Sequence, residues 1–172
     1  MKEHKIRNKS RKDLVLDLDH TIIYCEKKIL RSSKVVRNII TRPFLFDFLN
    51  DLKKYYRLNI FTAGDKKYCE FILSTIKNKN YKFYKILNRD HLSEGKKKLN
   101  EISNDYKKII LIDDNDYYFE NKKNAIKIKP FYGKSNDRVL LKLKNILIKI
   151  NKFDDMTKGI SVFKNELKKI NK

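Results

Sequence analysis

Three apolar runs that end abruptly in polar residues stand out along the chain. They are DLVLDL at residues 13–18, RLNIFTAG at 57–64 and KKIILIDDN at 107–115. A near-continuous apolar run is typical of a strand that is buried on both faces of a parallel sheet. Weaker strand patterns occur in FYKIL at 83–87 and AIKIK at 125–129. We therefore expect a parallel sheet built from these segments.

Helical patterns separate the expected strands. Residues 43–55 begin with Pro43 at a first-turn position, and residues 65–78 begin with Asp65 as the N-cap. Both segments carry apolar residues at helical spacing, namely Phe44, Phe48, Leu49 and Leu52 in the first, and Tyr68, Phe71, Ile72 and Ile76 in the second. This alternation of strands and helices is the pattern of an α/β fold.

The C-terminal part of the chain is expected to be helical. Residues 136–152 place six apolar side chains on one stripe, namely Val139, Leu140, Leu143, Ile146, Leu147 and Ile150. A shorter helix is expected within 159–170, and residues 22–41 are predicted to form a short β-hairpin that turns near Ser32 and Ser33. The pattern predicts one α/β domain at 13–172, preceded by a basic N-terminal arm at 1–12.

Composition excludes several classes of protein. The chain has 172 residues, 41% of them apolar, which is enough for one domain with a substantial core. No apolar run approaches the roughly 20 residues that span a bilayer, and the basic N-terminus lacks the apolar segment of a signal peptide. Cys25 and Cys69 have no partners at metal-ligand spacing, so we expect both to be reduced. We expect an intracellular protein without a membrane anchor, in the nucleus or the cytoplasm, or inside a host cell if the source is viral.

The net charge of +21 raises the question of a nucleic-acid partner, because clustered Lys and Arg bind phosphate backbones. The positive residues are mostly Lys and are scattered along the chain among many Asn and Ile, as a coding bias towards A and T would also produce. We favour the bias over a dedicated nucleic-acid surface. A basic surface would still attract a polyanionic or phosphorylated substrate.

Side chains that can do chemistry follow three of the expected strands. Asp17 and Asp19 end the first, Thr62 ends the second, and Asp113 and Asp114 end the third. The structural alternative is that such residues make turns and cap helices. In an open parallel sheet, however, ligands bind at the carboxyl ends of the strands. Carboxylates at this density would repel one another unless a cation lay among them, and oxygen ligands select a hard ion such as Mg²⁺.

Motifs across residues 13–165 resemble a known family. DLDHT at 17–21 is similar to the Asp-x-Asp-x-Thr signature of the haloacid dehalogenase superfamily, whose fold is a Rossmann-like parallel sheet flanked by helices. TRPFLFDFL at 41–49, NIFTAGDKKYCEFIL at 59–73 and KKLNEISNDYKKIILIDDN at 97–115 resemble successive segments of the FCP/SCP-type phosphatases of the RNA polymerase II C-terminal domain. INKFDDMTKGI at 150–160 is similar to the C-terminal end of that branch. Several motifs in one order are more specific than any motif alone.

The resemblance implies a role for each acid. Asp17 would attack phosphorus and form an aspartyl-phosphate. Asp19 would act as general acid and base, and side chains two apart on a strand share a face, so both acids could reach one phosphoryl group. The Asp17 carboxylate, the Asp19 backbone carbonyl and Asp114 would hold Mg²⁺. Asp113 would orient a Lys or a metal-bound water, and Thr21 would support the loop by hydrogen bonding.

The resemblance also implies a phosphate-binding set. Thr62 and the backbone amides of Ala63 and Gly64 would bind the phosphoryl oxygens, although the branch usually has Ser where this chain has Gly64. A Lys would complete the set, and counting back from the acidic pair selects Lys97 over its neighbours Lys96 and Lys98; all three could instead be solvated lysines.

Two further residues fit the resemblance less specifically. His20 occupies a variable position and is expected to be an exposed side chain rather than a catalyst. Arg89 resembles an Arg that follows the third strand region of relatives, and a surface role is an equal alternative. The insert between Thr21 and Arg42 is shorter than in many relatives.

The sequence thus favours an enzyme, a Mg²⁺-dependent phosphatase for phosphoserine or phosphothreonine in proteins, with the polymerase C-terminal domain as the leading substrate. The first alternative is a phosphatase of the same superfamily for another phosphoester, such as a nucleic-acid 3′-phosphate. The second is a non-catalytic scaffold, like the mitochondrial import-receptor relatives that keep the fold and lose the acids. Retention of both Asp17 and Asp19 speaks against the scaffold.

Overall fold

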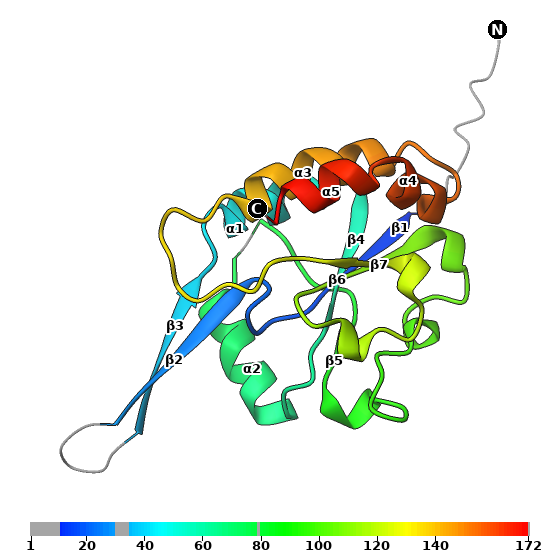
Figure 1. Cartoon of the computed structure of the whole chain (residues 1–172). Coiled ribbons are helices and arrows are strands. Elements are labelled where there is room, and N and C mark those ends of the chain that lie inside the picture. Colours follow the sequence, from blue (N-terminus) through cyan, green and yellow to red (C-terminus); the bar gives the residue numbers. More distant parts are fainter. Residues whose placement is uncertain (1–10, 30–34, 79, 172) are drawn as a thin grey trace, which may run out of the picture.

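A five-stranded parallel sheet forms the centre of the protein (Figure 1). The computed structural model describes residues 11–29, 35–78 and 80–171, so the expected arm at 1–12 lies outside the described residues except for its last two. The strands are β1 (Lys12–Leu16), β4 (Tyr56–Phe61), β5 (Ile86–Leu87), β6 (Ile109–Asp113) and β7 (Ala125–Lys127), in the order β5-β4-β1-β6-β7. The three main expected strands are confirmed, whereas the weaker pattern at 83–87 contributes only two strand residues.

Strand β1 occupies the middle of the sheet, and every one of its residues is therefore buried. It pairs in parallel with β4 on one side and β6 on the other. Alternation along the strand sends Leu14 and Leu16 into the larger hydrophobic cluster and Val15 into a smaller cluster on the opposite face. The apolar run seen in the sequence is thus explained by burial on both faces.

Five α-helices contribute to the larger cluster. They are α1 (Leu45–Leu52), α2 (Lys66–Thr75), α3 (Val139–Ile150), α4 (Met156–Val162) and α5 (Lys164–Lys169). All six residues of the stripe expected in α3 are buried. The smaller cluster is covered mainly by irregular chain between β5 and β7, which includes the 3₁₀ helices η1 (Arg89–His91), η2 (Leu99–Glu101), η3 (Tyr106–Lys108), η4 (Asp116–Tyr118) and η5 (Lys122–Asn124).

Some details of the helices differ from the expectation. Phe44 is not on the buried stripe of α1, because it is the N-cap with a left-handed φ of 66° and is 37% exposed; Pro43 precedes the helix. Phe71 of α2 is 44% exposed, although Asp65 caps that helix as expected by accepting a hydrogen bond from the Tyr68 amide. The single short helix expected at 159–170 is divided between α4 and α5.

The expected hairpin is present as β2 (Ile23–Ile29) and β3 (Val35–Thr41), an antiparallel pair separate from the main sheet. It projects from the body of the protein on the side of α2 (Figure 1). The turn expected near Ser32 and Ser33 lies outside the described residues. Cys25 and Cys69 are free, as expected. None of the described helices has the length and apolar character needed to span a membrane.

Arg42 ties the base of the hairpin to the domain. Its side chain is fully buried and forms a bidentate ion pair with Asp137, at 3.0 and 2.9 Å. The same guanidinium donates to the backbone carbonyls of Thr21 at 3.0 Å and Lys129 at 2.9 Å. Four hydrogen bonds from one buried side chain thus join the loop after β1 to the chain that leads into α3.

Candidate active site

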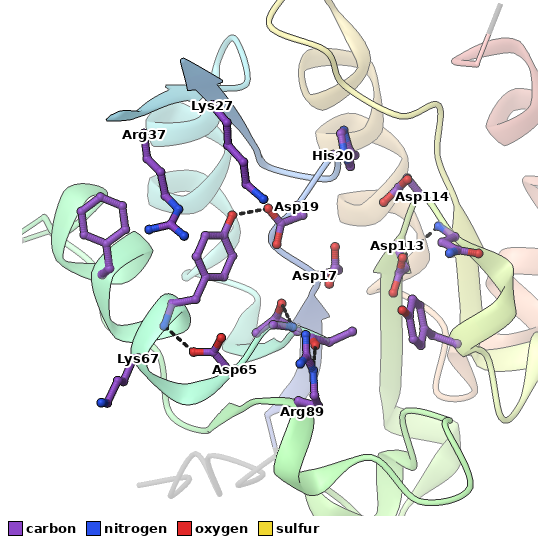
Figure 2. Close-up of a pocket in the computed structure, with 17 residues that line it drawn as sticks. Asp17, Asp19, His20, Lys27, Arg37, Asp65, Lys67, Arg89, Asp113 and Asp114 are labelled. Atoms are coloured by element: carbon purple, nitrogen blue, oxygen red, sulfur yellow. Dashed lines mark hydrogen bonds between the residues drawn. The ribbon is translucent and has the colours of Figure 1, made fainter. Parts of the chain in front are cut away.

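A cavity of about 660 Å³ lies at the carboxyl ends of the central strands (Figure 2). Asp17 follows β1, Thr62 follows β4, and Asp113 and Asp114 stand at the end of β6. The parallel order β4-β1-β6 brings these positions to one edge of the sheet. Asp19 lines the same cavity, so the structure brings together all five residues that the sequence placed at strand ends.

The loop after β1 is held in a defined turn. The Leu18 carbonyl accepts the amides of Thr21, Ile22 and Ile23 at 3.0–3.3 Å. His20 adopts a left-handed φ of 58° within this turn. Its ring is half-buried, beside the carbonyl of Phe131 at 3.0 Å, rather than exposed as expected. The turn directs the Asp19 carboxylate towards α2, where the Tyr68 hydroxyl donates a hydrogen bond to it.

Lys97 lies between two of the acids. Its Nζ is 2.6 Å from Asp17 Oδ1 and 2.7 Å from Asp113 Oδ2, and its side chain is completely buried. Lys96 instead donates to the Tyr117 carbonyl, and the Lys98 ammonium lies 4.0 Å from the exposed carboxylate of Glu94. Of the three consecutive lysines, only Lys97 therefore reaches the acids of the cavity.

Thr21 holds the second acid of the pair after β6. Its hydroxyl donates to Asp114 Oδ1 at 3.2 Å and accepts the Asp114 amide at 3.1 Å. Asp113 uses both carboxylate oxygens inside the protein, one for Lys97 and one for the Asn115 amide at 2.9 Å. This division favours Asp113 as the residue that positions Lys97, and Asp114 as the one with an oxygen to offer a ligand.

The acids form a donor set that suits a hard cation. One oxygen from each of Asp17, Asp113 and Asp114 lies within 4.8 Å of the others. Carboxylate oxygens converging in this way match the ligand preference of Mg²⁺, which usually keeps water and substrate oxygens in its remaining positions. The residues present therefore fit a magnesium ion.

Burial and mutual repulsion raise the pKa values of these acids. Desolvation, followed by the charge of Asp17, raises the pKa of Asp113 to about 7. The pKa of Asp114 is raised by the same two causes. Desolvation also raises the pKa of Asp19, although the hydrogen bond from Tyr68 opposes the rise. Such shifts in a cleft are typical of functional carboxylates.

The segment after β4 forms a small polar loop. Thr62 is buried, and its hydroxyl oxygen accepts the Gly64 amide at 3.0 Å. The Gly64 amide is thus already bonded, whereas the Ala63 amide has no hydrogen-bond acceptor among the described residues. A Cβ on Gly64 would lie 2.8 Å from Cδ1 of Tyr68, so glycine at this position gives space to the tyrosine that binds Asp19.

Several cavity residues could not be identified from the sequence pattern. Lys27 and Arg37 reach the cavity from the hairpin (Figure 2), and Lys67 of α2 borders it with its side chain turned outward. The two hairpin residues could have been found only from the pairing of β2 with β3. Arg89 also lines the cavity, where its Nε donates to the Ala63 carbonyl at 2.8 Å.

Several proteins with similar sequences carry phosphatase names, whereas another, the mitochondrial import inner membrane translocase subunit TIM50 of Yarrowia lipolytica, is 30% identical over 135 residues and does not. Residues 12–157 match the family described as NLI interacting factor-like phosphatase. A protein of Dictyostelium discoideum named "Probable C-terminal domain small phosphatase" is 26% identical over 160 residues, which cover 84% of this chain and 52% of that protein. A "CTD phosphatase-like protein" of Invertebrate iridescent virus 3 is 29% identical over 182 residues, which cover 83% of this chain and 98% of that protein.

A solved structure has the same fold. It is the fission yeast RNA polymerase II CTD phosphatase Fcp1 bound to beryllium fluoride, with a TM-score of 0.61 and 21% identity, covering 93% of this chain and 57% of that one. The likeness confirms the expected fold, a parallel α/β sheet flanked by helices. This chain spans about half the length of the Dictyostelium protein and of the Fcp1 structure.

Proposed function

Because the chain belongs to the NLI interacting factor-like phosphatase family, we propose that it is a magnesium-dependent phosphatase for phosphoserine or phosphothreonine in proteins. One observation carries the proposal. A buried lysine joins Asp17 and Asp113 in a cavity that Asp19 and Asp114 also line. This arrangement sets a nucleophile, a proton donor and a positive charge around one small volume, which is what phosphoryl transfer requires.

Asp17 is the proposed nucleophile. Its Oδ1 accepts a hydrogen bond from Lys97, whereas its Oδ2 has no partner among the described residues and is available to attack. Attack forms an Asp17–phosphorus bond and breaks the bond from phosphorus to the serine or threonine oxygen. The product of this step is an aspartyl-phosphate and a departing alkoxide.

Asp19 is the proposed proton carrier. Its raised pKa favours a protonated carboxyl, which gives its proton to the alkoxide as that group departs. The carboxylate so formed then accepts a proton from water, which attacks phosphorus and releases phosphate together with free Asp17. The Tyr68 hydroxyl keeps the Asp19 carboxyl oriented during both steps.

The remaining residues stabilise charge. Lys97 supplies a positive charge beside Asp17, and the Thr62 hydroxyl and Ala63 amide are the groups at the end of β4 that can donate to phosphoryl oxygens. Bound Mg²⁺, held by Asp17, Asp114 and the backbone carbonyl of Asp19, would neutralise charge on those oxygens. Asp113 and Thr21 position Lys97 and Asp114.

The proposed substrate is a phosphorylated protein segment. The cavity is bordered by a two-stranded hairpin rather than by a folded cap domain, which suits an extended peptide better than a small metabolite. The phosphorylated C-terminal domain of RNA polymerase II is the first substrate to test, because relatives carry its name. We assign residues 13–172 to a single phosphatase domain and propose the nucleus or cytoplasm as its location.

Release of phosphate from three substrates tests the proposal. They are p-nitrophenyl phosphate, a phosphoserine peptide and a 3′-phosphorylated oligonucleotide, each with Mg²⁺ and with EDTA. We expect Mg²⁺-dependent turnover of the first two, loss in Asp17→Asn, and retention in the matched control Asp47→Asn, whose side chain is exposed on α1. Activity in EDTA, or full activity in Asp17→Asn, would contradict the mechanism. Turnover of the oligonucleotide far above that of the peptide would replace the proposed substrate class.

Beryllium fluoride provides a second test, because it imitates a phosphoryl group bound to a carboxylate. With Mg²⁺ present, we expect it to raise the melting temperature of the parent protein and not that of Asp17→Asn. Equal stabilisation of both proteins would place the reacting carboxylate elsewhere.

A further inference from the structure

The hairpin carries two positive charges directly opposite each other. In the antiparallel register of β2 and β3, Lys27 pairs with Arg37. Like charges at facing positions of a strand pair are destabilising. On the other face, the neighbouring pair is complementary, because the Asn38 amide donates to Glu26 Oε2 at 3.4 Å. The like-charged pair is therefore confined to one face of the hairpin.

This face is turned towards the cavity. Cys25 and Ile39, paired two residues nearer the base of the hairpin, lie on the same face and pack against the larger hydrophobic cluster. Lys27 and Arg37 continue that face beyond the cluster, and both point towards the cavity in Figure 2. Both side chains are exposed and extend from the face of the hairpin that borders the cavity.

Neither cation is neutralised within the described residues. No carboxylate lies within ion-pair distance of the Lys27 ammonium or the Arg37 guanidinium there. The acid towards which Lys27 points in Figure 2 is Asp19, which is already hydrogen-bonded to Tyr68. Lys67 of α2 also borders the cavity, but its ammonium points away from the hairpin cations in Figure 2.

The cavity is therefore polarised. The acids of the proposed chemistry stand at the strand ends, whereas Lys27 and Arg37 stand on the hairpin, and Asp65 at the start of α2 already serves as a helix N-cap (Figure 2). A single phosphoryl group at Asp17 would leave the hairpin charges without a counter-ion. We propose that Lys27 and Arg37 form a second anion subsite, which binds a phosphate or carboxylate flanking the phosphorylated residue of a peptide. This inference rests on the proposed phosphatase function for its choice of ligand.

Binding to Asp17→Asn tests the subsite without turnover. The probes are three fluorescent phosphoserine peptides of equal length, with neutral flanks, with Glu flanks and with a second phosphoserine, and affinity is measured by fluorescence anisotropy. Because charge-assisted contacts between exposed groups are individually weak, we expect the acidic peptides to bind about five- to tenfold more tightly than the neutral one. We expect the doubly charged phosphate to exceed Glu.

The preference is then measured in Lys27→Gln/Arg37→Gln, in the same Asp17→Asn background. In this variant, the affinity for an acidic peptide should be within twofold of the affinity for the neutral peptide. The matched control Lys142→Gln/Lys169→Gln removes two exposed charges from α3 and α5 and should keep the preference for acidic peptides. Since the hairpin variant relieves a like-charge pair, its melting temperature should not be lower than that of its parent.

Three results would overturn the inference. The first is equal affinity for neutral and acidic peptides, and the second is a preference that survives loss of both hairpin charges. The third is an oligonucleotide with a 3′-phosphate that binds more tightly than either acidic peptide through the same two residues, which would assign the subsite to a nucleic-acid backbone.

Activity of the protein with intact Asp17 separates this inference from the proposed function. Turnover of all three peptides at similar kcat/KM would leave the phosphatase and remove the subsite. Tight binding of acidic peptides through the hairpin without any hydrolysis by the intact protein would remove the phosphatase and leave the subsite.

Discussion

Replacing Lys97 with Met tests whether the acids depend on one buried counter-ion. The substitution keeps a long unbranched side chain and removes only the charge that Asp17 and Asp113 share. Both carboxylates are almost fully buried, with side-chain exposures of 8% and 1%, so water in the cavity can replace the ammonium only in part. Breaking a buried ion pair on one side is costly because it strands a buried charge.

The expected loss is large for a domain of this size. In EDTA at pH 8, we expect the free energy of unfolding to fall by about 3–5 kcal/mol, which corresponds to about 10 °C in melting temperature. The loss should be smaller at pH 5.5 by at least about 1 kcal/mol, because Asp113 is then protonated and no longer a stranded charge; its pKa is about 7 beside Lys97 and rises further when that charge is removed.

Urea unfolding measured at both pH values is the assay. Lys98→Met is the matched control, because its ammonium is partly exposed and lies 4.0 Å from an exposed glutamate, a contact worth less than about 1 kcal/mol. Lys97→Met/Asp113→Asn should recover about half of the lost stability at pH 8, since the second substitution removes one of the two carboxylates that have lost their counter-ion. With Mg²⁺, Lys97→Met should also lose about 100-fold or more in kcat.

Two results would refute this reasoning. If Lys97→Met were as stable as Lys98→Met at pH 8, Lys97 would not be the counter-ion of the acids. If the double variant were no more stable than the single one, the loss would come from poor packing of Met rather than from stranded charge.

Three further predictions follow from the structure. Gly64→Ala should displace the Tyr68 ring from Asp19 and lower kcat about tenfold, as should Tyr68→Phe; a fully active Gly64→Ala would show that the ring need not hold that acid. Arg42→Met should cost about 3–5 kcal/mol in urea unfolding, because it strands Asp137 and two carbonyls, and an unchanged midpoint would contradict this. In EDTA the melting temperature should fall as pH rises from about 4 to about 7, since the folded protein holds the Asp113 proton more tightly than the unfolded chain. Mg²⁺ should reverse this fall at neutral pH. A melting temperature that rises with pH in EDTA would contradict the raised pKa of Asp113.

The sequence predicts the parts of the fold that local pattern controls. Burial on both faces gives β1, β4 and β6 their continuous apolar runs, and the single stripe of α3 reports one buried face. Periodicity fails where partial burial depends on distant chain. Phe44 and Phe71 occur at helical spacing and are nevertheless exposed, because nothing in the described structure packs over them.

The site divides in the same way. The ends of the strands can be predicted from the sequence, and parallel pairing then brings Asp17, Thr62 and Asp113 together. The choice among three consecutive lysines depends on which side chain points into the cavity. Lys97 could be predicted only from the resemblance to the phosphatase family. The pairing of Arg42 with Asp137, 95 residues apart, depends on how two loops meet and has no local signal.

A chain of hydrogen bonds joins the base of the hairpin to the acids of the cavity. The Arg42 amide donates to the Ile22 carbonyl at 2.9 Å, its guanidinium fixes Thr21, and Thr21 in turn fixes Asp114. Substitutions in the outer part of the hairpin therefore leave these contacts in place, whereas Cys25 and Ile39 nearer the base pack against the larger hydrophobic cluster. Substitutions in the hairpin can therefore change the preferred substrate while the reaction itself is kept. Replacing the residues between Ile23 and Thr41 with the hairpin of a relative is a direct way to make a phosphatase with new targets.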